Sequence, residues 1–234
     1  MRRTAAQPME VRVSEYEDIK IKAQMTGMFE TPVVMAKFEQ SDQLIDDLKR
    51  IILNQMETDP GGMKRSNVGG WHSDTEMLTW GGLPARILAE KAIAMAKRMS
   101  AFSGKTHEAF DWWCQMWANV SGPGAANHIH VHPGNLWSAV LYIDMGGGGE
   151  TGDDVSSSEG RFYFEDPRFP MAYMHNSKFR FVSTDGQGAP VQPEIRTQRG
   201  DFLMFPAWLR HGVRPYLGNR QRISIALNVD AIPI

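Results

Sequence analysis

The chain has 234 residues, of which 42% are hydrophobic, and its formal net charge at pH 7 is −2. A charge so close to zero gives no electrostatic reason to expect a nucleic acid or an anionic membrane as a partner, and the negative mean hydropathy with no long apolar run excludes a membrane-spanning helix. Cys114 is the single cysteine, which excludes an intramolecular disulfide and a thiolate zinc site within one chain. The two N-terminal arginines precede no apolar segment, so we expect no secretory signal and a cytoplasmic protein.

The N-terminal part of the chain predicts one strand and two helices. Residues 31–38 place β-branched side chains after a proline, which is typical of a short strand. Residues 41–56 carry apolar side chains at helical spacing, and residues 84–99 form a second, partly apolar helix. The segment 66–82 between them is rich in glycine and polar residues, so we expect a loop there.

After Gly104 the pattern changes to short strands separated by glycine and proline, which is typical of a β-barrel or sandwich. A chain of this length can bury a substantial core, so we expect one domain over residues 1–234, with helical support at about 40–102 and a barrel core at about 108–230. We expect the strand at 136–144 to pair with the histidine-rich strand before it. The predicted strands are 110–120, 127–132, 136–144, 161–165, 179–183, 191–196, 200–206 and 222–229.

Residues 144–160 contain no lysine or arginine and few side chains that could pack. We expect a mobile surface loop rather than a linker between domains, because the strand pattern resumes at residue 161. Whether this loop serves as a lid stays open.

Three histidines stand at every second position of the segment 127–132: His128, His130 and His132. Successive side chains of a strand point to opposite faces, so the three imidazoles would share one face, where they suit a transition metal such as Fe, Zn, Cu or Ni. Neighbours in this set would lie about 6.6 Å apart along the strand and the outer two about 13 Å apart, so one neighbouring pair can converge on an ion. Because Pro133-Gly134 ends the strand, we favour His130 with His132 and rank His128 with His130 second. The alternative is an exposed strand whose solvated face carries histidines.

A second motif lies near the C-terminus, where His211 precedes Arg222 in an apolar strand with ten residues between them. A cation in such a strand is costly unless it meets an anion, so Arg222 predicts a carboxylate partner, from the protein or from a ligand. A guanidinium binds a carboxylate through two parallel hydrogen bonds, which lysine cannot reproduce.

These motifs resemble the iron(II) and 2-oxoglutarate-dependent oxygenases, which are built on a double-stranded β-helix, or jelly-roll, barrel. His211 and Arg222-Ile-Ser224 match the His-x10-Arg-x-Ser pattern of that superfamily. A sharper resemblance, over roughly residues 112–229, is to a bacterial group of such oxygenases of unknown substrate. It is carried by Trp117-Ala-Asn119, His130-Val-His-Pro-Gly134, Trp137-Ser-Ala-Val-Leu-Tyr142, Phe164-Glu-Asp-Pro167, Gly200-Asp-Phe-Leu-Met-Phe-Pro206 and the final strand.

The resemblance implies a mainly β fold with flanking N-terminal helices and an Fe(II) site made by His130, His132 and His211. It also implies that Arg222, assisted by Ser224, holds the far carboxylate of 2-oxoglutarate. Further cosubstrate contacts are expected from Tyr142 and Asn119.

The sequence departs from the superfamily at His132, because most members have Asp or Glu in that slot. Asp144 and Asp201 are the nearest acids, and neither has the usual spacing. Four tryptophans could wall the pocket, namely Trp112, Trp113, Trp137 and Trp208.

The implied activity is hydroxylation of an unidentified substrate with O2, releasing succinate and CO2. The sequence allows a homo-oligomer. Two alternatives stay open: a non-catalytic jelly-roll module that binds a metal or a small acid, and a three-histidine iron dioxygenase that does not use 2-oxoglutarate. The second alternative would not need Arg222.

Overall fold

The computed structural model describes residue 22 and residues 26–147, 160–183 and 185–234. Residues 1–31 and residues 32–234 form two separate compact units. The described residues of the first unit contain no helix or strand. None of the helices in the described part of the chain has the length and apolar character needed to span a bilayer.

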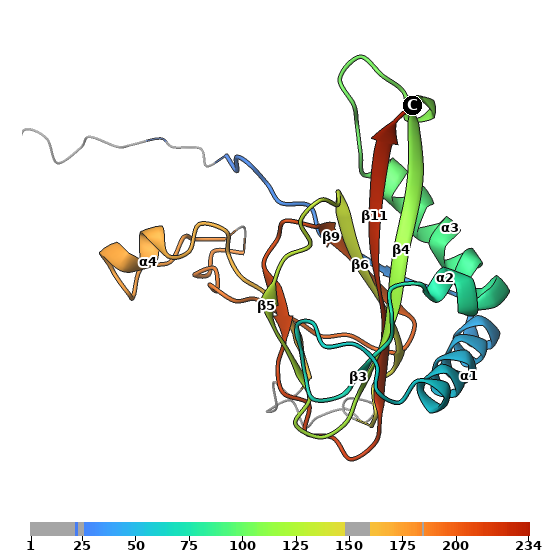
Figure 1. The fold of residues 1–234 in the computed structure, drawn as a ribbon. Helices are drawn as coiled ribbons and strands as arrows, with labels where there is room; N and C mark the ends of the chain where they lie inside the picture. The colour runs from blue at the N-terminus through green and yellow to red at the C-terminus, as the bar shows by residue number, and fades with distance from the viewer. Residues whose placement is uncertain (1–21, 23–25, 148–159, 184) are drawn as a thin grey trace, which may run out of the picture. The chain divides into compact units, whose positions relative to one another are not determined.

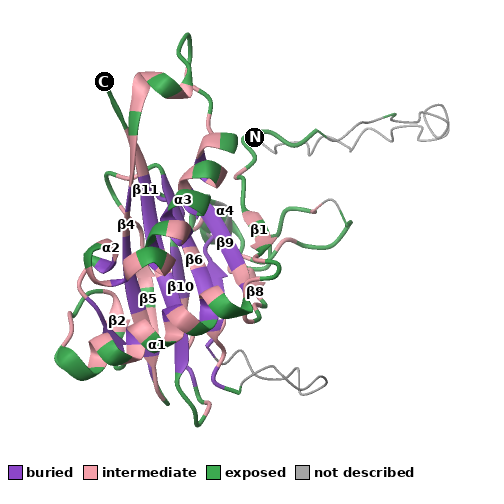
Figure 2. Ribbon diagram, turned by 90° about the vertical axis from the view of Figure 1, so that its right-hand side faces the viewer, coloured by how far each residue is buried: buried purple, intermediate pink, exposed green. Residues whose placement is uncertain are grey.

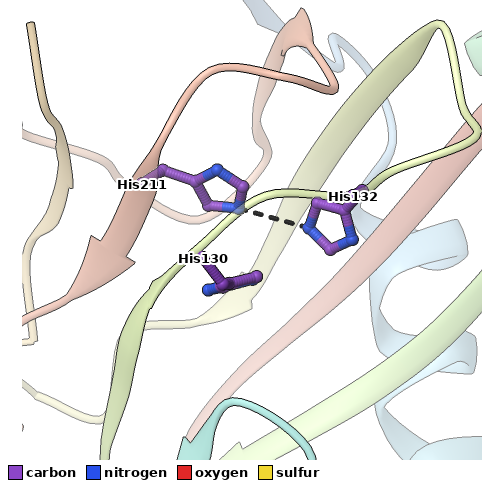
Figure 3. A group of neighbouring side chains, drawn as sticks. All are labelled: His130, His132 and His211. Carbon is purple, nitrogen blue, oxygen red and sulfur yellow. Dashed lines mark hydrogen bonds between the residues drawn. The ribbon is translucent and has the colours of Figure 1, made fainter. Parts of the chain in front are cut away.

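The second unit contains two antiparallel sheets (Figure 1). The six-stranded sheet has the order β1 (Val34–Lys37), β9 (Asp201–Pro206), β6 (Trp137–Asp144), β11 (Arg222–Pro233), β4 (Phe110–Ser121) and β3 (Trp71–His72). The five-stranded sheet has the order β2 (Asn67–Val68), β5 (Ala126–His130), β10 (His211–Val213), β7 (Phe162–Phe164) and β8 (Glu194–Ile195). Its β5 and β10 place His130 opposite His211 in register (Figure 3).

Three helices cover the outer face of the six-stranded sheet: α1 (Asp42–Thr58), α2 (Met77–Trp80) and α3 (Gly82–Arg98). In α1 the residues Ile45, Leu48 and Ile52 are buried at helical spacing, whereas the opposite side is exposed (Figure 2). The buried face of α3 is mostly alanine, which lets this helix approach the sheet closely. A short 3-10 helix (His107–Ala109) precedes β4, and α4 (Met171–His175) lies between β7 and β8, away from the other helices.

Strand alternation separates two sets of side chains in the six-stranded sheet. Residues such as Leu141 and Leu227 belong to the core shared with the helices. The intervening positions, such as Tyr142 on β6, pack with β7 and β9 in a second, aromatic cluster between the sheets. The face of β4, β6 and β11 that looks away from the helices therefore carries the polar side chains that matter below.

The predicted helices 41–56 and 84–99 and the strands at 31–38, 110–120, 161–165, 200–206 and 222–229 are confirmed within a few residues. The predicted pairing of 136–144 with the histidine strand is wrong. Strand β6 pairs with β9 and β11, whereas β5 lies in the other sheet beside β2 and β10. The residues between β5 and β6 cross from one sheet to the other, so chain neighbours are not sheet neighbours here.

Two further predictions need correction. The expected loop 66–82 contains β2, β3 and α2. The expected strand 179–183 forms one isolated bridge, between Val182 and Gly188, because its exposed aromatic residues find no neighbouring strand in the described part of the chain. The strand expected at 191–196 is short, and only β8 forms there.

Residues 148–159 of the expected loop 144–160 lie outside the described residues, so its mobility stays a prediction and its service as a lid stays open. Its two ends are anchored to the segment before β11. The Tyr216 hydroxyl donates to the Gly146 carbonyl at 2.6 Å, and the Gly160 amide donates to the Pro215 carbonyl at 2.9 Å.

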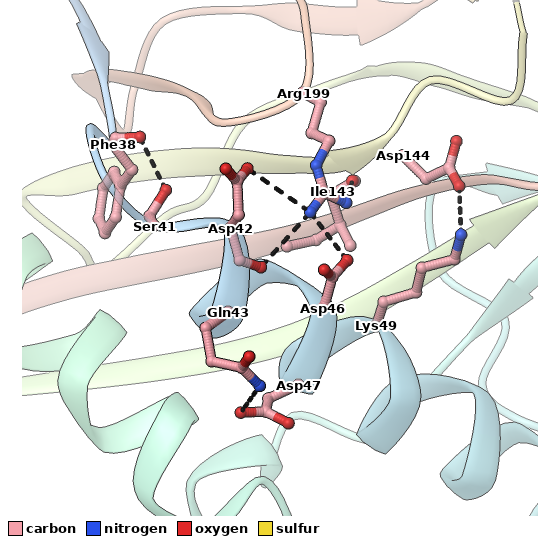
Figure 4. A network of polar contacts seen from close by, with 10 residues as sticks. All are labelled: Phe38, Ser41, Asp42, Gln43, Asp46, Asp47, Lys49, Ile143, Asp144 and Arg199. Carbon is pink, nitrogen blue, oxygen red and sulfur yellow. Dashed lines mark hydrogen bonds and ion pairs between the residues drawn. The ribbon is translucent and has the colours of Figure 1, made fainter.

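Ion pairs also join α1 to the end of β6 and to the segment just before β9 (Figure 4). Lys49 Nζ lies 2.6 Å from an oxygen of Asp144, and Arg199 Nη2 lies 2.8 Å from Asp46 Oδ1. These side chains are partly exposed, so water and salt screen the charges.

We expect burial of Leu48, rather than these ion pairs, to hold α1 in place. Leu48→Ala should lower the free energy of unfolding by about 2–5 kcal/mol because it leaves a cavity, whereas Lys49→Met should change it by about 1 kcal/mol or less. Urea unfolding of both variants measures the difference. A cost for Lys49→Met equal to that of Leu48→Ala would show that charge, not burial, fixes the helix.

Candidate metal centre

Three histidines from two strands and a connecting loop converge between the sheets (Figure 3). His130 is the last residue of β5, His211 is the first of β10, and His132 follows in the loop after β5. Each offers one ring nitrogen, and these atoms all lie within 4.8 Å of one another. The Nε2 atoms of His132 and His211 are 3.2 Å apart.

The end of β5 at His130 explains which pair converges. The strand ends at His130, and the ring centroids of His130 and His132 are 4.9 Å apart just past that end. His128 remains inside the strand, and its side chain is exposed and outside the group. The structure thus brings together the favoured pair with His211.

Contacts at the Nδ1 atoms orient two of these rings. The Nδ1 of His130 lies 2.7 Å from the His128 carbonyl oxygen, and the Nδ1 of His211 lies 2.7 Å from that of Leu209. A carbonyl can only accept, so Nδ1 carries the proton in both rings and the lone pair of Nε2 faces the centre. This is the tautomer that a metal ligand needs.

Burial favours neutral imidazoles at this centre. Desolvation lowers the pKa of His130, lowers the pKa of His132 to about 4 and lowers the pKa of His211 to about 3, and the positive charge that His130 would carry adds to the effect on the other two. The His211 ring packs between Phe162 and Phe205, at centroid distances of 5.3 and 4.7 Å. Neutral imidazole is the form that binds a metal, so the ligands are ready at neutral pH.

In the described part of the chain, no Asp or Glu belongs to the histidine group. Asp144 pairs with Lys49, and Asp201 lies 3.7 Å from Lys37. Neither acid supplies the carboxylate that most of the superfamily has. The three possible metal ligands are all neutral nitrogen atoms. A divalent cation bound by them would keep its full charge and would attract an anionic ligand.

Arg222 lies in the same pocket as the three histidines, with its side chain 4% exposed. None of the ion pairs found among the described residues includes it, and its Nε has no hydrogen-bond partner there. Burial lowers the pKa of Arg222. The sequence predicted a carboxylate partner for Arg222, from the protein or from a ligand. No acid of the protein pairs with it among the described residues, and a buried guanidinium without a carboxylate is costly.

Three more predicted residues lie near Arg222: Ser224 on the same strand, and Asn119 and Tyr142 on the two neighbouring strands. Ser224 lies opposite Asn119 of β4 on one side and opposite Tyr142 of β6 on the other. Tyr142 is fully buried, and desolvation raises its pKa to about 12, against the opposing effects of the nearby Arg222 and Thr197 side chains. The guanidinium carbon of Arg222 is 5.4 Å from the centre of its ring. These four side chains form a polar end of the pocket, with one cation, two hydroxyl groups and one amide.

The sequence analysis named the wrong tryptophans as candidates to line the pocket. None of Trp112, Trp113, Trp137 and Trp208 lines the pocket, and Trp137 belongs to the core beneath the helices. Trp117 does line it, with its ring 5.6 Å from that of His132 and stacked on His72. Its place in the alternation of β4, beside Asn119, is the signal that could have found it. Other lining residues missed from sequence are Ser66, Asn127, Ser138, Phe162 and Phe205.

Comparison with known proteins supports one family. The family described as "Putative 2OG-Fe(II) oxygenase" matches residues 115–228, a segment that contains all three histidines, Arg222 and the strands around them. Over this segment the chain is similar to the 2OG-Fe(II) oxygenases. The match supports an oxidoreductase that uses Fe(II) and 2-oxoglutarate. Among curated proteins, none matches the sequence.

Solved structures agree with this chain in fold. A prolyl-4-hydroxylase from Pseudomonas putida is 15% identical, with a TM-score of 0.52 over 86% of this chain and 92% of that one. A prolyl hydroxylase from Trichoplax adhaerens, in complex with a peptide fragment of hypoxia inducible factor, is 11% identical, with a TM-score of 0.56 over 84% and 82%. HygX from Streptomyces hygroscopicus, with nickel and 2-oxoglutarate bound, is 14% identical, with a TM-score of 0.52 over 86% and 82%. The expected double-stranded β-helix is confirmed.

Proposed function

We propose that this protein binds Fe(II) through His130, His132 and His211 and uses 2-oxoglutarate to hydroxylate an unidentified substrate, with release of succinate and CO2. The observation that carries the proposal is the buried Arg222, which shares a pocket with the three histidines and meets no carboxylate among the described residues. An anionic cosubstrate would supply the missing charge. The bound iron and 2-oxoglutarate together supply the oxidising chemistry.

The protein's own residues bind and orient. Arg222 would donate two parallel hydrogen bonds to the far carboxylate of 2-oxoglutarate, and Ser224 and Tyr142 would donate hydroxyl hydrogen bonds to it. Asn119, opposite Ser224 in register, is placed to contact the same molecule. Phe162 and Phe205 exclude water from the His211 side of the pocket, which strengthens the electrostatic contacts inside it.

Arg222 also separates this function from the alternatives. A three-histidine dioxygenase that does not use 2-oxoglutarate has no need of a buried cation at the end of its pocket. A binding module for a small acid could use Arg222 but would not consume O2. We therefore propose the 2-oxoglutarate-dependent reaction, in a cytoplasmic protein that can form homo-oligomers.

Anaerobic titration tests the proposal. Adding Fe(II) and then 2-oxoglutarate to the full-length protein should produce a visible metal-to-ligand charge-transfer band, because the cosubstrate chelates the metal beside Arg222. Succinate should appear when O2 is admitted. Fe(II) binding without a band would favour the dioxygenase that does not use 2-oxoglutarate, and tight zinc binding with neither band nor turnover would favour the binding module.

A further inference from the structure

His132 differs from the other two histidines in what its Nδ1 meets. His130 and His211 each face a backbone carbonyl, whereas the Nδ1 of His132 lies 3.5 Å from the side-chain Nδ2 of Asn228. Asn228 lies on β11 and is 5% exposed. Its register partner on β6 is Ser138, which is 2% exposed and donates its hydroxyl to Asn228 Oδ1 at 2.9 Å. A buried serine and a buried asparagine therefore lie behind the ring of His132, on the side of its Nδ1.

This arrangement of hydrogen-bond donors conflicts with metal binding by His132. An amide nitrogen can only donate, so its contact with Nδ1 requires a lone pair there and puts the ring proton on Nε2. Yet Nε2 is the atom that lies 3.2 Å from His211 Nε2, within the converging group. If Nε2 gives its lone pair to a metal, Nδ1 carries the proton and two donors face each other.

Rotating the carboxamide of Asn228 by a half-turn resolves the conflict, because the two orientations have nearly the same shape. Oδ1 then accepts from His132 Nδ1–H, and Nδ2 donates to Ser138. The serine hydroxyl can accept as well as donate, so Ser138 satisfies the amide in either orientation. With the backbone positions unchanged, the 3.5 Å contact needs to shorten by a few tenths of an ångström to reach an ordinary N–H···O distance.

We propose that Asn228, supported by Ser138, is a positioning residue that selects the metal-binding tautomer of His132. The inference rests on the proposed role of His132 as a metal ligand. His130 and His211 are oriented by the backbone, so His132 is the ligand whose orientation depends on a side chain. Outer hydrogen-bond partners of this kind typically change metal affinity about 10–100-fold when removed.

Gln115 provides a matched control. It lies opposite Asn228 on β4, in the same cross-strand row, and also carries a side-chain amide, which is half-buried. Its Nε2 donates to Thr75 Oγ1 at 3.2 Å, and it does not line the pocket. Replacing either amide with leucine removes similar atoms from the same face of the sheet, but only one of the two replacements removes a contact to His132.

The test is the affinity of the full-length protein for Co(II), followed by its visible absorption, together with the melting temperature of the metal-free protein. Asn228→Leu should weaken Co(II) binding about 10–100-fold, whereas Gln115→Leu should change it by about twofold or less. Asn228→Asp keeps an acceptor for Nδ1–H and should bind Co(II) at least as tightly as the wild type. Wild-type Co(II) affinity in a folded Asn228→Leu variant would overturn the proposal. Weaker Co(II) binding by a folded Asn228→Asp variant would also overturn it. If the leucine variant does not fold, the aspartate variant decides the question.

The wild type and His132→Ala in the same titration keep this proposal separate from the proposed function. If the wild type binds no Co(II), or His132→Ala binds as well as the wild type, the metal assignment itself fails. If His132→Ala is weakened and Asn228→Leu is not, the metal site stands and the positioning role of Asn228 is wrong. A lower melting temperature of metal-free Asn228→Leu at unchanged affinity would likewise show a purely structural role.

Discussion

Replacing His211 with alanine should abolish tight Fe(II) binding, whereas His128→Ala should leave it nearly unchanged. His211 is buried between two phenylalanine rings and aims Nε2 at the other two histidines, so its loss removes a donor that no nearby side chain in the described structure can replace. We expect a loss of affinity larger than the about 10–100-fold that the removal of an outer hydrogen-bond partner causes. Anaerobic equilibrium titration with Fe(II) measures it.

His128→Ala is the matched control, because it removes an imidazole from the same strand at the spacing that the sequence left open as an alternative. Its side chain is exposed and outside the converging group, although its backbone amide donates to Ser66. Alanine keeps that backbone contact. Loss of metal in His128→Ala, with retention in His132→Ala, would show that the other neighbouring pair binds the ion.

Arg222→Lys should keep the charge at the end of the pocket and lose the two-point contact. We expect 2-oxoglutarate binding to weaken by roughly 1.5–3 kcal/mol, which is about ten- to a hundredfold, while Fe(II) affinity hardly moves. The reason is that a lysine ammonium cannot present two parallel donors to one carboxylate. Titration of the Fe(II)-loaded variant with 2-oxoglutarate, through the charge-transfer band, measures the change.

Arg214→Lys serves as the control for Arg222→Lys, because Arg214 also lies over an aromatic ring but does not line the pocket. Its Nε lies 3.0 Å from Glu194, and its guanidinium stacks over Tyr163 at 3.9 Å. We expect unchanged 2-oxoglutarate affinity in this control. The cosubstrate role of Arg222 would be refuted by unchanged affinity in Arg222→Lys together with a stability loss of about 3–5 kcal/mol, the cost of breaking a buried ion pair.

The convergence of His130, His132 and His211 could be anticipated because strand geometry restricts which histidines can meet, and because the resemblance supplied the third. The residues at the polar end of the pocket were expected from the resemblance, and side-chain alternation along β4, β6 and β11 puts them on one face of the sheet. Only the choice of His130 with His132 depended on local geometry that the sequence encodes directly. The functional roles of Asn119, Tyr142, Arg222 and Ser224 remain proposals.

The pairing of β6 could not be anticipated in the same way. Side chains alternate between the two faces in the strands of both sheets, so the residue pattern of 136–144 does not indicate which sheet this strand joins. Its closeness in the chain to the histidine-rich strand favoured the wrong pairing. Ser138 and Asn228 escaped notice for a related reason. Each is a small polar residue in a largely apolar strand, and only the register that places them opposite each other and beside His132 gives them a role.

The three histidines together contact both sheets. His130 and His211 belong to strands of the five-stranded sheet, whereas His132, in the loop after β5, donates its backbone amide to Ala207, just after β9, and lies next to Trp117 and Asn228 of the six-stranded sheet. An ion held by all three would act as a cross-link between the two halves of the barrel. Because such an ion binds the folded chain and not the unfolded one, it would add about 2.7 kcal/mol of stability at a free concentration of 100 times its dissociation constant. The barrel's cohesion and its capacity for catalysis would then depend on the same metal.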